Sequence, residues 1–213
     1  MGKLLLYITA FALLFVIPAT FGPHIAAQQA FAQKVSPSAT PTLTPSGKVE
    51  KLHQMDILMG EHAALAAQMI IARYDKRADY SAAKKAVDNN SKLKAQGVES
   101  FYGQEARQQF ETIWNRHINA FLLYADAKKS GDKTKETEAI SQLQSFTEDV
   151  TNLLVGSQDR TLFYESAQDY FTQHIQVEKA ILDAYAAKNY TQMYSRMHQA
   201  YMHATSLSLT FRR

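Results

Sequence analysis

The stretch that decides the fold reads Trp-Asn-Arg-His-Ile-Asn-Ala-Phe-Leu-Leu-Tyr at residues 114–124. It lies inside a longer pattern in which apolar and aromatic side chains recur every three or four residues, the period of one helix face. That face holds a single imidazole, His117, among Phe110, Ile113, Trp114, Ala120, Phe121 and Tyr124. The stretch therefore predicts a long helix with a histidine in the middle of its buried face.

Two other segments repeat this arrangement around His62 and His174. The spacing of 55 residues from His62 to His117 is nearly matched by the 57 residues from His117 to His174. The apolar neighbours at helical spacing are Met55, Leu58, Met59, Leu65, Ala66 and Met69 around His62, and Tyr170, Phe171, Val177 and Ile181 around His174. Three helices are therefore expected to bury one histidine each.

The remainder of the chain after residue 48 is also typical of helices. No proline follows Pro45, glycines are few, and the good helix formers Ala, Gln, Lys, Glu and Leu are abundant. Asp79 or Ser81, Asp132 and Asn189 are expected to mark helix starts, and Gly131 is expected to end a helix. We predict an all-α fold with six helices at about 49–74, 80–100, 104–129, 133–155, 161–188 and 191–210.

Short connections pair these helices into three antiparallel hairpins. His117 precedes Asp132, and His174 precedes Asn189, by the same 15 residues, whereas the hairpin of His62 needs two extra residues. The pattern predicts a pseudo-repeat of about 55 to 60 residues, and a stacked or closed bundle built from it.

The N-terminal segment has the features of a secretory signal peptide. Lys3 precedes an apolar run at 4–19, and Ala30-Phe31-Ala32 provides a small-x-small cleavage site before Gln33. The run is short for a membrane span, which needs about 20 apolar residues, although an uncleaved anchor is the alternative. Export is therefore expected, to the periplasm, the cell surface or the medium, with no stable membrane span after processing.

Three segments follow from this division of the chain. Residues 1–32 are the expected signal peptide, and residues 33–48 are a linker rich in Ser, Thr and Pro with few side chains that could pack. Residues 49–213 form one helical domain, which is large enough to bury a core.

Composition excludes several classes of protein. The chain contains no cysteine, which excludes disulfides, thiolate metal sites, a cysteine nucleophile and covalent haem attachment. The formal charge of +3 comes from basic residues interspersed with acidic ones, so no nucleic-acid footprint is present. Neither Gly-x-Ser-x-Gly nor a phosphate-binding Gly-rich loop occurs, and Glu50-x-x-His53 has no second copy that would complete a di-iron site. Nothing in the sequence demands an enzyme.

The buried histidines suggest a transition-metal site. Neutral imidazole is a common ligand, and histidines from several helices of a bundle can meet at one ion. Copper is the preferred metal, followed by zinc or iron, because methionines concentrate in the first and last helices and could add thioethers. The candidate ligands are His62, His117, His174 and His203, with Glu61 or Glu178 as carboxylate and Met59 and Met197 nearby.

Two alternatives stay open. The histidines could be core residues bonded to backbone carbonyls in a non-catalytic structural or partner-binding module at the cell surface. Aromatic side chains around histidine also suit a non-covalent haem pocket. Convergence of the three imidazoles would favour metal, separated rings with backbone partners would favour the structural module, and haem would require an adjoining planar cavity.

The sequence also resembles a group of exported bacterial all-helical proteins of unassigned activity, over about residues 58–209. The resemblance is carried by Gly60-Glu61-His62, Asp88-Asn89-Asn90-Ser91, Trp114-x-x-His117-Ile118 and Ala200-Tyr201-x-His203. It implies that His62, His117, His174 and His203 belong together. Members sometimes carry a copper amine oxidase label, but the Asn-Tyr-Asp/Glu cofactor motif is missing here, because Thr191 follows Asn189-Tyr190.

Overall fold

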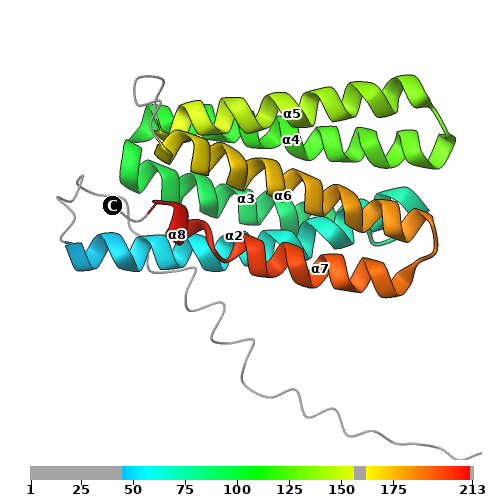
Figure 1. Cartoon of the computed structure of the whole chain (residues 1–213), viewed down its shortest axis with the longest axis horizontal. Helices are drawn as coiled ribbons and strands as arrows, with labels where there is room; N and C mark the ends of the chain where they lie inside the picture. The colour runs from blue at the N-terminus through cyan, green and yellow to red at the C-terminus, as the bar shows by residue number, and fades with distance from the viewer. Residues whose placement is uncertain (1–44, 156–161, 212–213) are drawn as a thin grey trace, which may run out of the picture. The chain divides into compact units, whose positions relative to one another are not determined.

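The structure is a computed structural model that describes residues 45–155 and 162–211. The predicted signal peptide, most of the predicted linker and Gly156 lie outside the described residues. The helices, labelled as in Figure 1, are α2 (Pro45–Asp75), α3 (Tyr80–Tyr102), α4 (Gln104–Ser130), α5 (Lys133–Val155), α6 (Leu162–Ala186), α7 (Tyr190–Ala204) and the short α8 (Leu207–Phe211). No strand occurs within these ranges, so the predicted all-α fold is confirmed.

Local sequence signals set most helix boundaries. Gly131 ends α4 in the left-handed conformation with φ of 73°, and the carboxylate of Asp132 then accepts a hydrogen bond of 3.1 Å from the backbone N–H of Lys135. Asn189 caps α7 by accepting from the N–H of Gln192. Asp79 precedes α3 without a side-chain cap. The main difference at the N-terminal side is that α2 begins at Pro45, four residues before the expected start.

The last predicted helix is in fact two helices. Thr205 and Ser206 interrupt it, and the Ser206 hydroxyl donates 2.6 Å to the carbonyl of His203, an acceptor that a continuing helix would use. The chain then enters α8, where the buried carboxylate of Asp56 accepts a hydrogen bond of 2.7 Å from the N–H of Ser208. A residue far away in the sequence therefore fixes this break.

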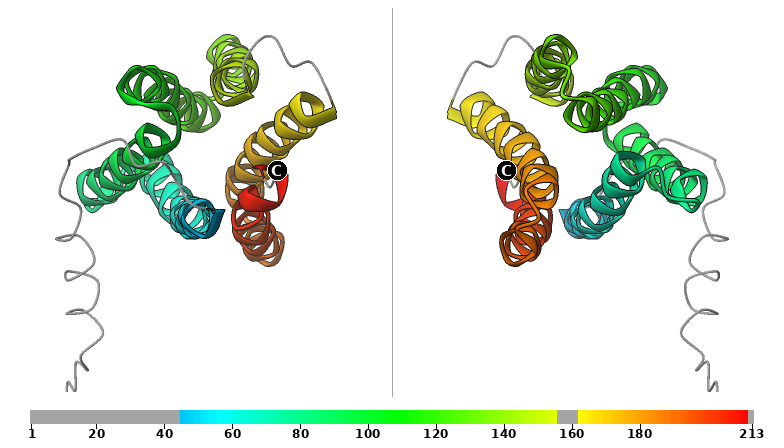
Figure 2. Two further views of the ribbon diagram at one scale, coloured as in Figure 1. Left: turned by 90° about the vertical axis from the view of Figure 1, so that its left-hand side faces the viewer. Right: turned by 90° about the vertical axis from the view of Figure 1, so that its right-hand side faces the viewer.

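Six long helices form a closed arrangement in which hairpin partners lie side by side (Figures 1 and 2). The first helices of the hairpins, α2, α4 and α6, contact one another. Each second helix also packs on the next hairpin: α3 contacts α4, α5 contacts α6, and α7 returns to contact α2. Since α2, α4 and α6 run in the same direction, equivalent side chains on them can meet at one level. Whether the hairpins are sequence repeats stays a prediction.

Gly60 allows the close approach of α2 and the end of α7. A Cβ atom added to Gly60 would lie 2.7 Å from Cγ2 of Thr205 and 3.1 Å from the Tyr201 ring.

On length and hydropathy alone, Gly47–Asp75 qualifies as a membrane span, yet 67% of its most apolar window is buried inside the protein. Burial of this kind is expected of a core helix.

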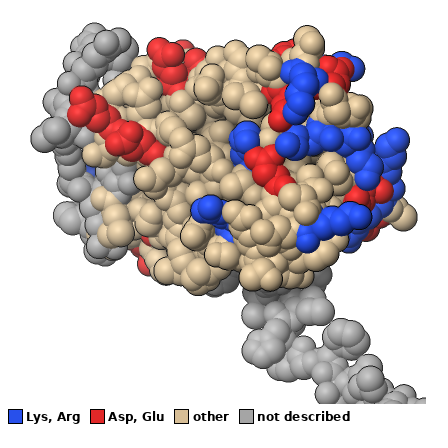
Figure 3. Space-filling view, turned by 45° about the vertical axis from the view of Figure 1, so that its right-hand side comes forward, with Lys and Arg blue, Asp and Glu red and all other residues tan. Residues whose placement is uncertain are grey.

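Charged side chains of both signs lie together on the surface, and one such face is visible in Figure 3. Arg73 of α2 binds the carboxylate of Asp126 in α4 with two hydrogen bonds of 2.9 and 2.7 Å. Lys128 of α4 lies 3.1 Å from Asp183 of α6. These exposed or half-exposed pairs contribute about 0–1 kcal/mol each, so the buried interior dominates stability.

Candidate metal centre

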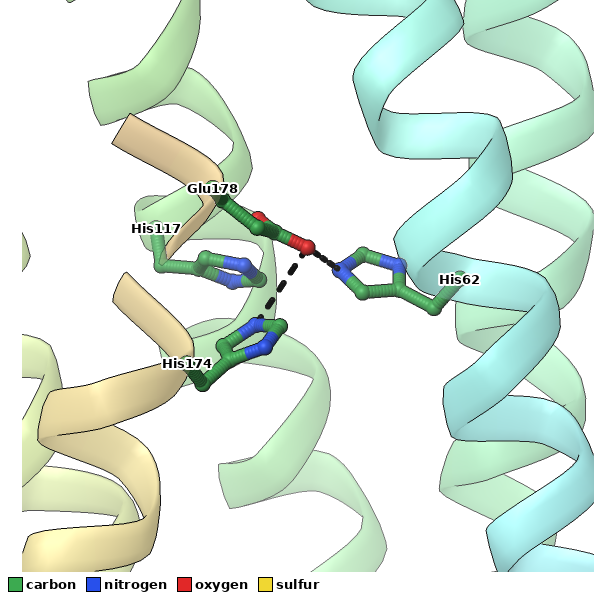
Figure 4. Close-up of side chains that lie close together, drawn as sticks. All are labelled: His62, His117, His174 and Glu178. Carbon is green, nitrogen blue, oxygen red and sulfur yellow. Dashed lines mark ion pairs between the residues drawn. The ribbon is translucent and has the colours of Figure 1, made fainter. Parts of the chain in front are cut away.

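Three histidines and one glutamate meet between α2, α4 and α6 (Figure 4). The ring centroids of His62 and His117, of His62 and His174, and of His117 and His174 lie 5.6, 5.6 and 5.9 Å apart. Glu178 follows His174 by one helical turn and shares its face. One candidate ligand atom from each residue lies within 4.8 Å of all the others. The predicted convergence of the three imidazoles is therefore present.

All four side chains are shut off from solvent. The exposed fraction is 0% for His62 and His117, 2% for His174 and 1% for Glu178. The carboxylate Oε1 lies 3.8 Å from Nε2 of His62 and 3.7 Å from Nε2 of His174, the two contacts dashed in Figure 4. These distances are too long for hydrogen bonds. The atoms face one another across a gap that no protein donor or acceptor fills.

The unsatisfied atoms are concentrated here. Both ring nitrogens of His62, Nε2 of His117 and His174, and both carboxylate oxygens of Glu178 are buried without a hydrogen-bond partner. A buried polar group left unpaired destabilises the folded state by about 1–3 kcal/mol, and native proteins rarely accumulate such groups. Each of the four residues has at least one such atom, and one candidate ligand atom from each lies within 4.8 Å of the others, an arrangement that a single ion could satisfy.

His117 is already oriented as a ligand. Its Nδ1–H donates a hydrogen bond of 2.7 Å to the carbonyl of Trp114, one turn earlier in α4, which leaves Nε2 unprotonated and facing the cluster. Metal-binding histidines commonly fix their tautomer in this way. The rings of Trp114 and Phe146 also hold the imidazole, with centroids at 4.5 and 4.3 Å.

Burial controls the protonation of the cluster. It is the main cause that lowers the pKa of His62 and His174, and it lowers the pKa of His117 to about 3. The same burial raises the pKa of Glu178 to about 8, against the opposing field of Lys94. The imidazoles are therefore neutral at ordinary pH, the form that binds metals, whereas Glu178 would release a proton on metal binding.

The spacing suits a first-row transition ion. With metal–nitrogen distances of about 2.0–2.1 Å, four tetrahedral ligand atoms lie about 3.3 Å from one another. The observed separations of up to 4.8 Å would have to shorten to reach this geometry. Three imidazoles and one carboxylate match Zn²⁺, Cu²⁺ or iron better than Ca²⁺ or Mg²⁺, which prefer oxygen ligands alone.

Lys94 of α3 also belongs to this site, although it was not among the residues predicted from the sequence. It is fully buried, its Nζ has no hydrogen-bond partner, and Nζ lies 3.8 Å from the centroid of the Trp114 ring. Burial holds the pKa of Lys94 well below its usual value. Lys94 shares the buried face of α3 with Val87, Asn90, Ser91 and Val98, which lie at helical spacing from it. This spacing is the sequence pattern that could have predicted its burial.

The other predicted ligands lie elsewhere. His203 is not the fourth member of the group, because its Nε2 bonds the carbonyl of Tyr170 at 2.9 Å and its ring stacks on Tyr170 at 4.4 Å. Glu61 is exposed and accepts a hydrogen bond from Asn90, whose amide also bonds the Leu58 carbonyl. Glu178 is the carboxylate of the cluster.

The predicted methionines belong to the packing around the site. Met197 is half-buried and packs against the core. Met59 is buried and lines a cavity of about 210 Å³ together with Trp114 and Phe171, among other apolar residues. Met59, Trp114 and Phe171 each precede a histidine of the cluster by three residues. The cavity therefore lies about one helical turn from the candidate metal centre. Its volume is below the roughly 300–1,000 Å³ of pockets for drug-sized ligands.

Comparisons of the chain with protein-family models, with curated proteins and with solved structures gave no match. The candidate centre therefore rests on its own geometry: three neutral imidazoles and a carboxyl group, buried, unpaired and within reach of one ion.

Proposed function

We propose that this protein is an exported transition-metal-binding protein that holds one ion between His62, His117, His174 and Glu178. The observation that carries the proposal is the convergence of four buried residues, each with at least one polar atom that lacks a partner, on candidate ligand atoms within 4.8 Å of one another. A single metal ion could bind one atom from each residue at once. Its binding energy would also compensate for the desolvation of the carboxylate.

The arrangement favours metal binding over a purely structural role for the histidines. A structural role predicts separated rings that bond to backbone carbonyls. Within the cluster Nδ1 of His117 makes such a bond, to the Trp114 carbonyl, and that bond leaves its second nitrogen free for a ligand. The adjoining cavity is small, which favours an ion over haem.

Copper is our first candidate for the metal. For a given set of nitrogen and oxygen ligands, affinity rises to Cu²⁺ and then falls at Zn²⁺. Met59 lies one turn from His62 on the same helix face. Of the two methionines predicted near the metal, it is the one nearest in sequence to a histidine of the cluster. Zinc and iron are the next candidates. The predicted export signal and the resemblance to exported helical proteins, both taken from the sequence, support a function outside the cytosol.

The proposal can be tested on purified, untagged protein. Metal content is measured by mass spectrometry, and the protein stripped by chelator is titrated with Cu²⁺, Zn²⁺ and Fe²⁺ beside a His117→Ala, His174→Ala variant. We expect one ion per chain, and a loss of affinity in the variant beyond the roughly 10–100-fold typical of changes around a metal site. His198→Ala, which alters an exposed histidine of α7, is the matched control.

Fluorescence gives an independent reading of the same event. Trp114 is the single tryptophan of the chain, and its ring lies 5.1 and 4.5 Å from the rings of His62 and His117. Cu²⁺ in the centre should quench it with the same stoichiometry as the titration. Failure of wild-type protein to bind any of the three ions in its interior would contradict the proposal and favour the structural module.

A further inference from the structure

Lys94 is a buried group beside the candidate metal centre that lacks a hydrogen-bond acceptor. Its amine is fully buried, has no hydrogen-bond partner and lies on the face of the Trp114 ring at 3.8 Å. The same indole contacts the rings of His62 and His117. A fully buried lysine without an acceptor is rare, because even a well-placed aromatic face replaces only part of the lost hydration.

The charges of the centre do not balance once a metal is bound. Glu178 is the carboxylate of the cluster, so a divalent ion leaves one positive charge in the interior, and the Lys94 ammonium would add another. No other acid belongs to the ligand group: Asp56 accepts from Ser208, and Glu61, whose charge acts on Lys94 from an exposed position, accepts from Asn90. Buried charge that is not compensated is strongly unfavourable.

A metal in this centre could take a further ligand. Three imidazoles and a carboxylate provide four donor atoms, and Cu²⁺ or iron can bind another ligand beside them, such as water or hydroxide. A singly charged anion would cancel the positive charge that the metal and Glu178 leave. It would also provide the hydrogen-bond acceptor that the Lys94 amine lacks.

We infer that the metal-loaded centre binds a small anion, coordinated to the metal and hydrogen-bonded by Lys94. This inference rests on the proposed metal-binding function and specifies its ligand class: a small monoanion, such as hydroxide or a compact acid anion. Lys94 is the group that selects for negative charge, and the Trp114 ring holds its side chain in place. The Trp114 ring that Lys94 contacts also contacts His62 and His117, so the amine lies beside the ligand group.

Azide binding to the Cu²⁺-loaded protein tests the inference, because an azide ligand on Cu²⁺ gives a charge-transfer absorption band. The dissociation constant for azide is measured for the wild type, for Lys94→Met and for Lys94→Gln. The control is Lys92→Met, an exposed lysine two residues away on the same helix. We expect the Lys94→Met change to weaken azide at least tenfold and the control to leave it unchanged. Lys94→Gln keeps an N–H donor and should lose less.

The outcomes separate the two claims. Copper uptake without any azide band in the wild type would overturn the inference and leave the metal site in place. Equal azide affinity in the wild type and in both Lys94 variants would also overturn it. Tighter copper binding in Lys94→Met with unchanged azide affinity would show that Lys94 only opposes the metal charge. Wild-type protein that binds no copper would overturn both proposals.

Discussion

At the scale of single residues, His117 shows how burial prepares a ligand and makes the fold sensitive to acid. Burial and the charge of Lys94 lower its pKa to about 3, from 6.5 in an exposed histidine. The unfolded chain therefore binds a proton between about pH 6.5 and pH 3 that the folded protein excludes. The stability that His117 contributes is complete above pH 6.5 and is lost as the pH falls through this window.

We therefore expect the free energy of unfolding of metal-free protein to fall with acidification by about 1.4 kcal/mol per pH unit for His117 alone. Replacing it by Gln should reduce the slope by that amount. Urea denaturation at several pH values between 5 and 7, in chelator, measures the slope. His198→Gln on the exposed side of α7 should keep the wild-type slope. An unchanged slope in His117→Gln would show that the ring is protonated in the folded state.

Glu178 leads to a different prediction, because burial raises its pKa to about 8 and it must ionise to bind a metal. Metal binding by wild-type protein should therefore weaken by up to about tenfold for each unit that the pH falls below 8, and binding in this range should release one proton from this group. Glu178→Gln should bind metal more weakly and should not release this proton. Calorimetric titration in buffers of different ionisation enthalpy counts the protons. Equal proton release by both proteins would contradict the assigned role.

Residue patterns predicted much of this site and missed part of it. The helical stripes identified His62, His117 and His174, because a polar side chain within an apolar face is visible in sequence. Lys94 was missed because lysine is usually exposed. His203 was expected in the centre, yet its nitrogen bonds the Tyr170 carbonyl on a neighbouring helix, a contact that no local pattern reveals.

At the scale of helices, the contact between α2 and the end of α7 depends on Gly60. Replacing Gly60 by Ala would favour the isolated helix by up to about 1 kcal/mol. The new Cβ would, however, lie 2.7 Å from Cγ2 of Thr205, a short side chain that is held by bonds to the Tyr201 and Met202 carbonyls. Overpacking of this kind costs about 1–3 kcal/mol, so we expect net destabilisation.

A double-mutant cycle identifies the cause. Thr205→Ser removes Cγ2 and keeps the hydroxyl, so Gly60→Ala combined with Thr205→Ser should recover most of the lost stability in chemical denaturation. If Thr205→Ser does not restore the free energy of unfolding lost in Gly60→Ala, the contact with Thr205 is not the cause of the destabilisation.

Helix boundaries followed the sequence where the signal was local. Gly131, Asp132 and Asn189 end or cap helices through bonds to residues within one turn. The break between α7 and α8 was not predicted, because it depends on Asp56 reaching Ser208 from another part of the chain. Caps formed by residues within one turn can be predicted from the sequence. A buried cap between distant segments can be identified only once the fold is known.

At the scale of the whole molecule, the closed order of the helices produces the site. The parallel helices α2, α4 and α6 contact one another, and α3, α5 and α7 each join neighbouring hairpins around them. Because the three helices are parallel and their histidines lie at the same height along them, one imidazole from each helix reaches the centre. Metal binding should accordingly stabilise the entire bundle, by about 2.7 kcal/mol at a free metal concentration of 100 times the dissociation constant.

X-ray absorption spectroscopy of the metal-loaded protein tests the central claim most directly. We predict scattering from three imidazoles and at least one oxygen at about 2.0–2.2 Å, and a loss of imidazole scattering in His117→Ala, His174→Ala. A coordination shell of water and surface carboxylates, unchanged by these substitutions, would contradict a metal centre between α2, α4 and α6.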